Sequence, residues 1–236
     1  GEARMSTAFA ATAQQDRVAD EIFSNIQRTA EETAERLKAE QQQRNRESEF
    51  WNSRRSLTEI RDYSLARLVA PHVVLNVVLG RILAIVPPFV TLPAYVGGAP
   101  ASLNFDIAVI GYPGQGKDAA IDTATALVPD VRNASCTGLS SGEGLTALHA
   151  AIVQDTDADG KPMPDSEHTG CVNPRAVIRC SEVATLKSLF ARSGNSLLGM
   201  LNDAFNGHHL GGAVKQRMSN LQLPANGYRQ TLVVAA

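Results

Sequence analysis

The sequence predicts an α/β fold built on a mainly parallel sheet and preceded by a helical region. Three features favour this class. An apolar run at 104–110 ends in a glycine-rich turn and is followed by good helix formers, the strand–loop–helix order of parallel sheets. A second apolar run, at 176–180, ends in a polar pair. Residues 14–67 contain neither proline nor glycine and are rich in Ala, Glu, Gln and Arg, which favours helix.

Length and composition exclude several broad classes. The chain has 236 residues, of which 44% are hydrophobic and 19% charged, so a sizeable core is expected and wholesale disorder is excluded. The net charge of −2 excludes a globally basic chain but leaves room for a local basic patch. Three scattered cysteines, Cys136, Cys171 and Cys180, are too few for a disulfide scaffold. We therefore expect a reducing compartment and a cytoplasmic protein.

The membrane candidate is the apolar stretch 65–96. It is interrupted by four polar residues and a proline pair: Arg67, His72, Asn76, Arg81 and Pro87-Pro88. Its longest apolar run is far below the roughly 18 residues that a span requires, and no segment has the pattern of a signal peptide. We expect no membrane partner. The chain ends on the apolar run 231–236 with no turn after it, and we expect a piece of a longer protein.

In chain order, the elements begin with an exposed helical arm or linker over residues 1–49. Its apolar stripe, marked by Ile22, Ile26 and Leu37, is thin and fades over 40–47. A short coiled coil and a linker to another domain both fit this pattern. A run of arginines follows, which is either a solvated helix face or a contact to a nucleic-acid backbone. Its members are Arg44, Arg46, Arg54, Arg55, Arg61 and Arg67.

Residues 50–100 are predicted to form a helical region that packs on the core. Apolar residues recur at helical spacing between 50 and 68, and 73–86 is apolar enough for a buried helix. Pro87-Pro88 ends that helix, because proline cannot continue the hydrogen-bond ladder. A short strand is expected at 92–96. The core occupies 101–236 and is expected to be truncated at its C-terminal end.

The most specific motif is Gly111-Tyr-Pro-Gly-Gln-Gly-Lys117, the Gly-x-x-x-x-Gly-Lys pattern of a phosphate-binding loop, or P-loop. Its glycines let backbone N–H groups curve around an anion, the following helix directs its positive end at phosphate, and Lys117 supplies a fixed charge. The alternatives are a chance glycine-rich turn and a loop that binds nucleotide but hydrolyses it poorly. The predicted nucleotide-binding residues, with ATP as the ligand, are Gly111, Pro113, Gly114, Gln115, Gly116, Lys117, Asp118 and Ala119.

Asp118 departs from the usual motif, in which a Ser or Thr hydroxyl at this position binds Mg²⁺. A carboxylate also binds Mg²⁺, so Asp118 is a predicted metal ligand. The same carboxylate places a negative charge beside the phosphates of the nucleotide, which leaves hydrolysis an open question.

A P-loop enzyme needs a second acidic group at the end of a neighbouring strand to hold Mg²⁺ and orient water. Glu182 follows the 176–180 strand and is the candidate general base and Mg²⁺ ligand, although Ser181 stands where an Asp is usual. The alternative is that Glu182 belongs to the first turn of the next helix, where a carboxylate suits the helix dipole.

Glu143 has two open interpretations. It follows a serine pair before a helix expected at 146–153, so Ser140 or Ser141 could cap that helix with Glu143 near its third position. Alternatively, Glu143 faces the nucleotide site or a polynucleotide channel.

Two further patterns are interpreted as structural. The acidic run 155–160 imitates the opening of a calcium loop but lacks the final Glu, so we expect a surface loop between a helix and a strand. The cysteines and His208-His209 do not have the spacing of zinc ligands. A helix interrupted at 193–195 is expected over 188–205, and 232–235 is the expected last core strand.

Ring-forming ATPases use an arginine that reaches the γ-phosphate of a neighbouring subunit. Arg217 is the candidate for this role, and Arg229 is a second one. For both, the alternative is an exposed arginine on a hairpin.

With these pieces in order, the chain from about residue 50 to 236 resembles the DUF3987-type P-loop proteins of bacteria, phages and mobile elements, often the helicase-like part of primase–helicase proteins. Of the resembling stretches only the Gly-Lys loop is chemically specific, and the others count by order and spacing. They lie at 50–54, 86–93, 97–104, 111–117, 141–145, 181–186 and 200–207, and in the final strand.

The resemblance implies a RecA-like ATPase core with Lys117, Glu182 and Arg217 as its catalytic residues, and with Glu143 in a motif of unassigned role. It implies ATP and Mg²⁺ as cofactors, single-stranded DNA as partner, and a homo-oligomer such as a hexameric ring. The predicted function is an ATP-hydrolysing DNA helicase or translocase component of a replication or mobile-element protein. The alternative is a nucleotide-binding interaction module with weak or no hydrolysis, in which the arm recruits a partner.

Overall fold

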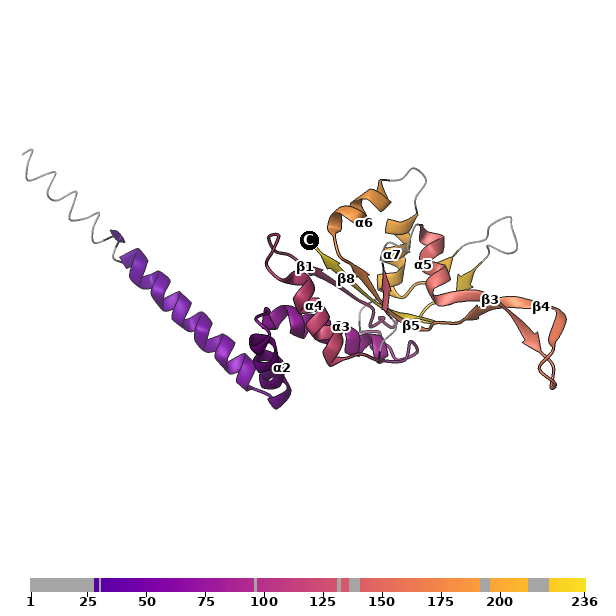
Figure 1. The fold of residues 1–236 in the computed structure, drawn as a ribbon, viewed down its shortest axis with the longest axis horizontal. Helices are drawn as coiled ribbons and strands as arrows, with labels where there is room; N and C mark the ends of the chain where they lie inside the picture. Colours follow the sequence, from indigo (N-terminus) through magenta and orange to yellow (C-terminus); the bar gives the residue numbers. More distant parts are fainter. Residues whose placement is uncertain are drawn as a thin grey trace, which may run out of the picture. The chain divides into compact units, whose positions relative to one another are not determined.

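The structure is a computed structural model, which describes residues 28–29, 31–95, 97–130, 133–135, 141–191, 196–211 and 221–236 (Figure 1). It divides into two compact units, with the boundary between Thr58 and Glu59. Each unit is described by itself below. The predicted positions Ile22, Ile26, Cys136 and Arg217 lie outside the described residues.

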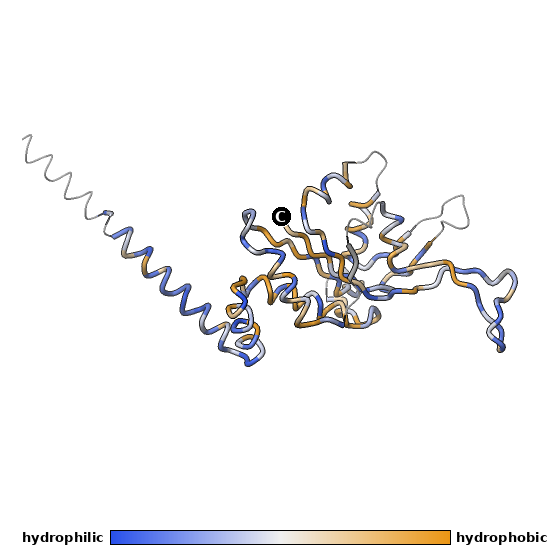
Figure 2. The backbone as a smooth tube through the Cα atoms, in the orientation of Figure 1, coloured by the Kyte–Doolittle hydropathy of each residue, from blue (hydrophilic) through white to orange (hydrophobic). Residues whose placement is uncertain are grey.

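The first unit contains a long exposed helix. Residues 31–52 are helical, and every described side chain along them is exposed except Trp51. Leu37 of the predicted stripe is 54% exposed, and in Figure 2 the residues along this helix are mostly hydrophilic. Arg36 and Glu40 form an ion pair across one helical turn at 3.1 Å, which supports a helix without a buried face. The next helix, α2 (Arg55–Ala66), crosses the boundary between the units.

The second unit is built on a four-stranded parallel sheet with the strand order β1-β8-β5-β2. Its strands are β1 (Phe105–Val109), β2 (Asn133–Ser135), β5 (Arg175–Cys180) and β8 (Arg229–Ala235). The predicted α/β class with a mainly parallel sheet is therefore confirmed, as are the strands expected at 104–110, 176–180 and 232–235. Hydrophobic residues follow these strands in Figure 2.

Helices cover both faces of this sheet, so its strands are apolar on both sides. One face packs against α3 (Pro71–Ile85) and α4 (Lys117–Leu127), where Val77, Ile121 and Val233 share a buried cluster. The other face packs against α5 (Gly142–His149), α6 (Val183–Phe190) and α7 (Leu197–Asn206). Leu145, Leu201 and Leu232 lie in that second cluster. Side chains of successive β8 residues thus point to opposite faces of the sheet.

Several local predictions hold. The buried helix expected at 73–86 is α3, and it ends just before Pro87. The interrupted helix expected at 188–205 is the pair α6 and α7. In place of the strand expected at 92–96, Leu92 forms an isolated antiparallel bridge with Ala101. Among the described helices, none combines the length and apolar character that crossing a membrane requires.

A two-stranded antiparallel ribbon is the main difference from the predicted elements. The helix expected at 146–153 ends at His149, and β3 (Ala150–Thr156) pairs with β4 (Pro162–Cys171). The acidic run is the surface turn of this hairpin, so it joins two strands rather than a helix and a strand. Asp157 Oδ1 accepts hydrogen bonds from the backbone N–H groups of Asp159 and Lys161. These bonds are ordinary Asx-turn chemistry. A second small ribbon pairs β6 (Leu210–Gly211) with β7 (Gln222–Leu223).

Candidate functional site

The loop between β1 and α4 has the backbone that the glycine motif predicts. Gly114 and Gly116 have φ angles of 81° and 74°, in the left-handed region that favours glycine. Gly116 is the N-cap of α4, and its carbonyl accepts from the N–H of Ala120 at 3.0 Å. A Cβ atom built at Gly114 or Gly116 meets nothing within 4 Å. Both glycines are therefore needed for backbone conformation, and the space beside them is open.

Hydrogen bonds within the loop hold it in this curled form. The Lys117 ammonium donates to the Gly111 carbonyl and, at 3.5 Å, to that of Tyr112. The Gln115 side-chain oxygen accepts from the N–H of Tyr112 at 2.8 Å. The loop is tied to the end of β8, because the N–H of Gly111 donates to the Ala236 carbonyl at 3.1 Å. Lys117 thus lies over its own loop, at the first position of α4.

A cavity of about 590 Å³ opens at this loop. It lies where β1, β8 and β5 reach their carboxyl ends, the edge at which parallel sheets bind ligands. The loop and the first turn of α4 form one wall, and the ends of β5 and β8 with the start of α6 form the rest. The lining residues are Pro113, Gly114, Gln115, Gly116, Lys117, Asp118, Ser181, Glu182, Val183, Ala184, Ala235 and Ala236.

Glu182 faces this cavity from the strand end predicted for it. It occupies the N-cap position of α6, with an extended backbone and no capping hydrogen bond from its side chain. The carboxylate is therefore not used to cap the helix. Since β8 lies between β1 and β5, the strands that carry the loop and Glu182 are roughly 9–10 Å apart, twice the usual strand spacing.

Asp118 has an ionic partner that the sequence did not predict. Arg179, on β5, donates from one terminal nitrogen to Asp118 Oδ1 at 2.7 Å and from the other to Asp122 Oδ1. Burial disfavours the charged guanidinium, but the two carboxylates outweigh it, so the pKa of Arg179 is raised. The sequence does contain a hint of this contact. Arg179 lies inside an apolar strand, and Asp118 and Asp122 lie one helical turn apart, so one arginine could bind both carboxylates.

Glu143 serves the capping arrangement rather than the cavity. The Ser141 hydroxyl accepts from the N–H of Gly144 at 3.3 Å and donates to Glu143 Oε2 at 3.0 Å. Ser141 is therefore the N-cap of α5, as one of the two interpretations predicts. Glu143 is absent from the lining of the P-loop cavity.

Arg229 is neither an arginine finger nor an exposed arginine on a hairpin, so both interpretations of it were wrong. Its side chain is fully buried at the start of β8, the end of the strand opposite the P-loop. Its guanidinium donates to the Ser102 hydroxyl and to a ring of backbone carbonyls, those of Val86, Pro87, Pro88 and Val90. Arg229 therefore closes the loop after α3. Arg217, the first candidate, lies outside the described residues.

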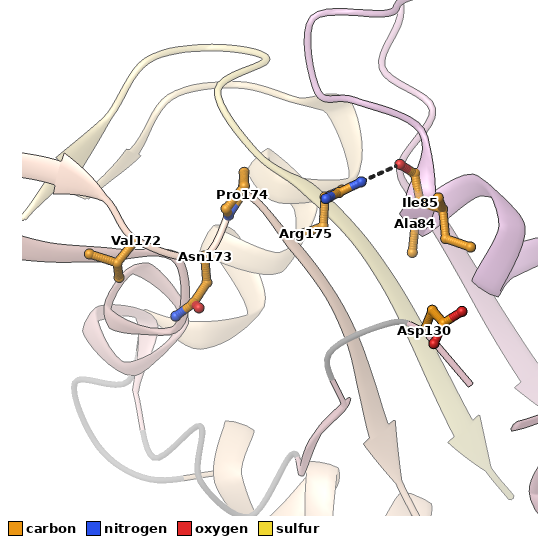
Figure 3. Close-up of a pocket in the computed structure, with 7 residues that line it drawn as sticks. All are labelled: Ala84, Ile85, Asp130, Val172, Asn173, Pro174 and Arg175. Atoms are coloured by element: carbon orange, nitrogen blue, oxygen red, sulfur yellow. Dashed lines mark hydrogen bonds between the residues drawn. The ribbon is translucent and has the colours of Figure 1, made fainter. Parts of the chain in front are cut away.

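A smaller cavity of about 170 Å³ lies near the amino end of β5 (Figure 3). Arg175 lines it and donates to the Ile85 carbonyl at 2.8 Å, and Asp130 and Asn173 also line it. The sequence did not predict this hollow, and its lining residues include no glycine.

The cysteines and the acidic residues are both possible metal ligands, and the structure describes most of them. Cys171 is free and exposed, whereas Cys180 is disulfide-bonded, contrary to the expectation of reduced cysteines. Within the described residues, no three His, Cys, Asp or Glu side chains gather as a metal site. Mg²⁺ bound with a nucleotide commonly uses only one or two carboxylates beside phosphate and water. Asp118 and Glu182 fit that pattern and remain the predicted ligands.

In comparisons with models of known protein families and with curated proteins, the chain matches none. The resemblance to DUF3987-type proteins therefore stays a prediction.

Proposed function

We propose that this chain binds a nucleoside triphosphate, ATP, in the P-loop cavity and hydrolyses it. One observation carries the proposal: two left-handed glycines and Lys117 form one wall of a cavity whose opposite wall holds a carboxylate. Backbone N–H groups at the start of α4 and the Lys117 ammonium are the groups that bind phosphate anions. The cavity volume of about 590 Å³ suits a ligand of this size.

Hydrolysis is proposed from the placement of Glu182. A gap of roughly 9–10 Å between the strands of Lys117 and Glu182 leaves room for a phosphoryl group and a water molecule between them. In this arrangement Lys117 binds phosphate oxygens, and Glu182 accepts a proton from the attacking water. Asp118 and Glu182 would hold Mg²⁺, which neutralises charge on the phosphates when bound.

The RecA-like core and the DNA helicase or translocase role extend this proposal. The strand order β1-β8-β5-β2 supports a RecA-like core, because it separates the P-loop strand from the strand that ends at Glu182 by one strand. Single-stranded DNA as partner, a homo-oligomeric ring and Arg217 as its finger rest on the resemblance alone. The exposed Arg44 and Arg46 of the arm, and Arg54 just after it, are available for contacts to phosphate backbones.

The test is an ATP titration with and without Mg²⁺, followed by measurement of hydrolysis with and without single-stranded DNA. Lys117→Ala should lower ATP affinity by at least about tenfold, since it removes the fixed cation of the site. Lys161→Ala makes the same charge change in the exposed hairpin turn and should bind as the native chain does. Equal ATP affinity of the Lys117 variant and the native chain would contradict the proposal.

A nucleotide-binding module without hydrolysis is the second candidate. The observation that favours it is Asp118, which stands in place of the Mg²⁺-binding hydroxyl and is engaged by Arg179. ATP binding without turnover, even with single-stranded DNA present, identifies this candidate. DNA-stimulated turnover that is lost in Lys117→Ala identifies the motor.

A further inference from the structure

The P-loop cavity carries a charge that opposes its proposed ligand. Asp118 lines the cavity beside Lys117, in the first turn of α4, and its side chain is 60% exposed. A helix N-terminus stabilises a carboxylate there, but a bound polyphosphate would lie against the same negative charge. Compensation of this charge is therefore a requirement for anion binding.

Arg179 supplies that compensation from the neighbouring strand. Its planar guanidinium binds Asp118 and Asp122 at once, and its two acceptors lie one turn apart on α4. The Arg179 side chain is only 31% exposed, so water screens this pair less than it screens a fully exposed one. Arg179 itself does not line the cavity, and it acts on the site through Asp118.

Two features set this arginine apart from a purely structural one. Arg229 donates mainly to backbone carbonyls, whereas both terminal nitrogens of Arg179 donate to side-chain carboxylates. The Nε atom of Arg179 is buried and has no acceptor among the described residues. Its contacts thus neutralise charge next to the cavity rather than saturate a backbone.

We propose that Arg179 is a positioning residue that neutralises Asp118 while no Mg²⁺ ion is bound there, so that the loop holds the phosphates of a nucleotide even when the metal is absent. The inference rests on the proposed function. Arg179 and a divalent cation compete for the same Asp118 carboxylate. Removing the arginine therefore exposes the carboxylate both to phosphate repulsion and to Mg²⁺.

The test measures the ATP affinity of the full chain in EDTA and in Mg²⁺. In EDTA, Arg179→Ala should bind ATP about tenfold more weakly than the native chain, which corresponds to about 1.4 kcal/mol. Mg²⁺ should restore most of this loss by taking the place of the guanidinium. The double variant Arg179→Ala/Asp118→Asn should recover affinity in EDTA, because the repelling charge is gone.

Arg175→Ala is the matched control, since it removes the same charge from the same strand at the end away from the loop. It should bind ATP as the native chain does in both buffers. Thermal unfolding of each variant checks that the chain is folded, and Arg179→Gln replaces Arg179→Ala if the latter does not fold.

The outcomes separate this inference from the proposed function. A native chain that binds no ATP, or a Lys117→Ala variant that binds it normally, overturns both. If the native chain binds and Lys117→Ala does not, two results overturn the role of Arg179 alone. One is native affinity of the Arg179 variants in EDTA. The other is a loss that neither Mg²⁺ nor Asp118→Asn relieves, which would mean that Arg179 only ties β5 to α4.

Discussion

At the amino end of β8, Arg229 is fully buried and its guanidinium is surrounded by backbone carbonyls and a serine hydroxyl. At the carboxyl end of the same sheet, Lys117 contacts two carbonyls of its own loop and lines a cavity of about 590 Å³. Near the amino end lie two hollows of about 170 and 490 Å³, and Arg229 lines neither of them. Both ends place a cation near polar backbone, yet only one of them leaves that cation beside open space.

This difference separates a structural cation, Arg229, from the cation that we propose binds phosphate, Lys117. A buried guanidinium is stable only when its donors are saturated, and saturation leaves it nothing to offer a ligand. Lys117 keeps three donors on a flexible stem, and its loop contacts can be exchanged for phosphate oxygens. The two cations therefore differ mainly in whether their donors are all engaged by fixed acceptors, and less in being an arginine and a lysine.

The largest expected effect is on stability, at the saturated end. Arg229→Ala removes a fully buried guanidinium together with its hydrogen bonds to one hydroxyl and four backbone carbonyls. Hydrogen bonds to a charged group contribute about 1.5–3 kcal/mol each, so we expect a loss of at least about 3 kcal/mol in the free energy of unfolding. Urea denaturation measures it. Arg175→Ala, an exposed arginine at the same end with one carbonyl contact, should cost less than about 1 kcal/mol.

Equal urea midpoints for the two arginine variants would mean that the saturated contacts of Arg229 do not stabilise the fold. ATP affinity offers a second readout, because the Arg229 variant, where it remains folded, should bind ATP as the native chain does. A binding loss without a stability loss would instead make Arg229 part of the site.

The next effect falls on the open end. Gly116→Ala forces a side chain into a left-handed conformation at a cost of roughly 1–2 kcal/mol. It should also weaken ATP binding, because relief of that strain moves the N–H groups of the loop. Gly199→Ala is the matched control: Gly199 lies within α7, its Cβ would meet nothing within 4 Å, and alanine there should stabilise the helix by about 0.5–1 kcal/mol.

Opposite signs for the two glycine variants in thermal unfolding, with an ATP-binding loss in Gly116→Ala alone, are the expected pattern. Stabilisation by both would mean that the loop has no need of a left-handed residue. The loop backbone would then not be held in the conformation that we propose binds phosphate.

The sequence was informative where interactions are local. The strand–loop–helix order around Gly111–Lys117, the end of α3 at Pro87 and the capping by Ser141 each depend on residues within a few positions of one another. The partners of Arg179 and Arg229 could not be predicted in this way. Asp118 lies 61 positions from Arg179, and Val90 lies 139 from Arg229, so only the folded sheet brings them together.

The hairpin of β3 and β4 was missed for a different reason. Residues 146–153 suit a helix by composition, but the chain leaves the helix at His149. From Ala150 onward its residues pair with a strand that begins at Pro162. Pairing across a turn overrides a weak local preference.

The smallest expected effect concerns an acidic residue on β1. Asp106 lines a hollow on the edge of that strand together with His72, and burial raises the pKa of its carboxyl to about 6, although a hydrogen bond from Leu232 opposes this shift. From pH 4 to pH 6 the folded chain keeps a proton that the unfolded chain has lost. Stability contributed by this group therefore falls as the pH rises through that window, and the full penalty is present above pH 6.

Asp106→Asn should remove this penalty and stabilise the chain at pH 7 while leaving its stability at pH 4 unchanged. Because Asp106 is exposed on the edge strand β1, solvent screening limits the gain to less than about 1 kcal/mol. Urea midpoints at the two pH values measure the effect. An equal gain at both values would show that the charge of Asp106 is not its cause. A loss at pH 7 would mean that the carboxylate has a cationic partner, and the edge of β1 would then resemble the clamp of Arg179 on α4.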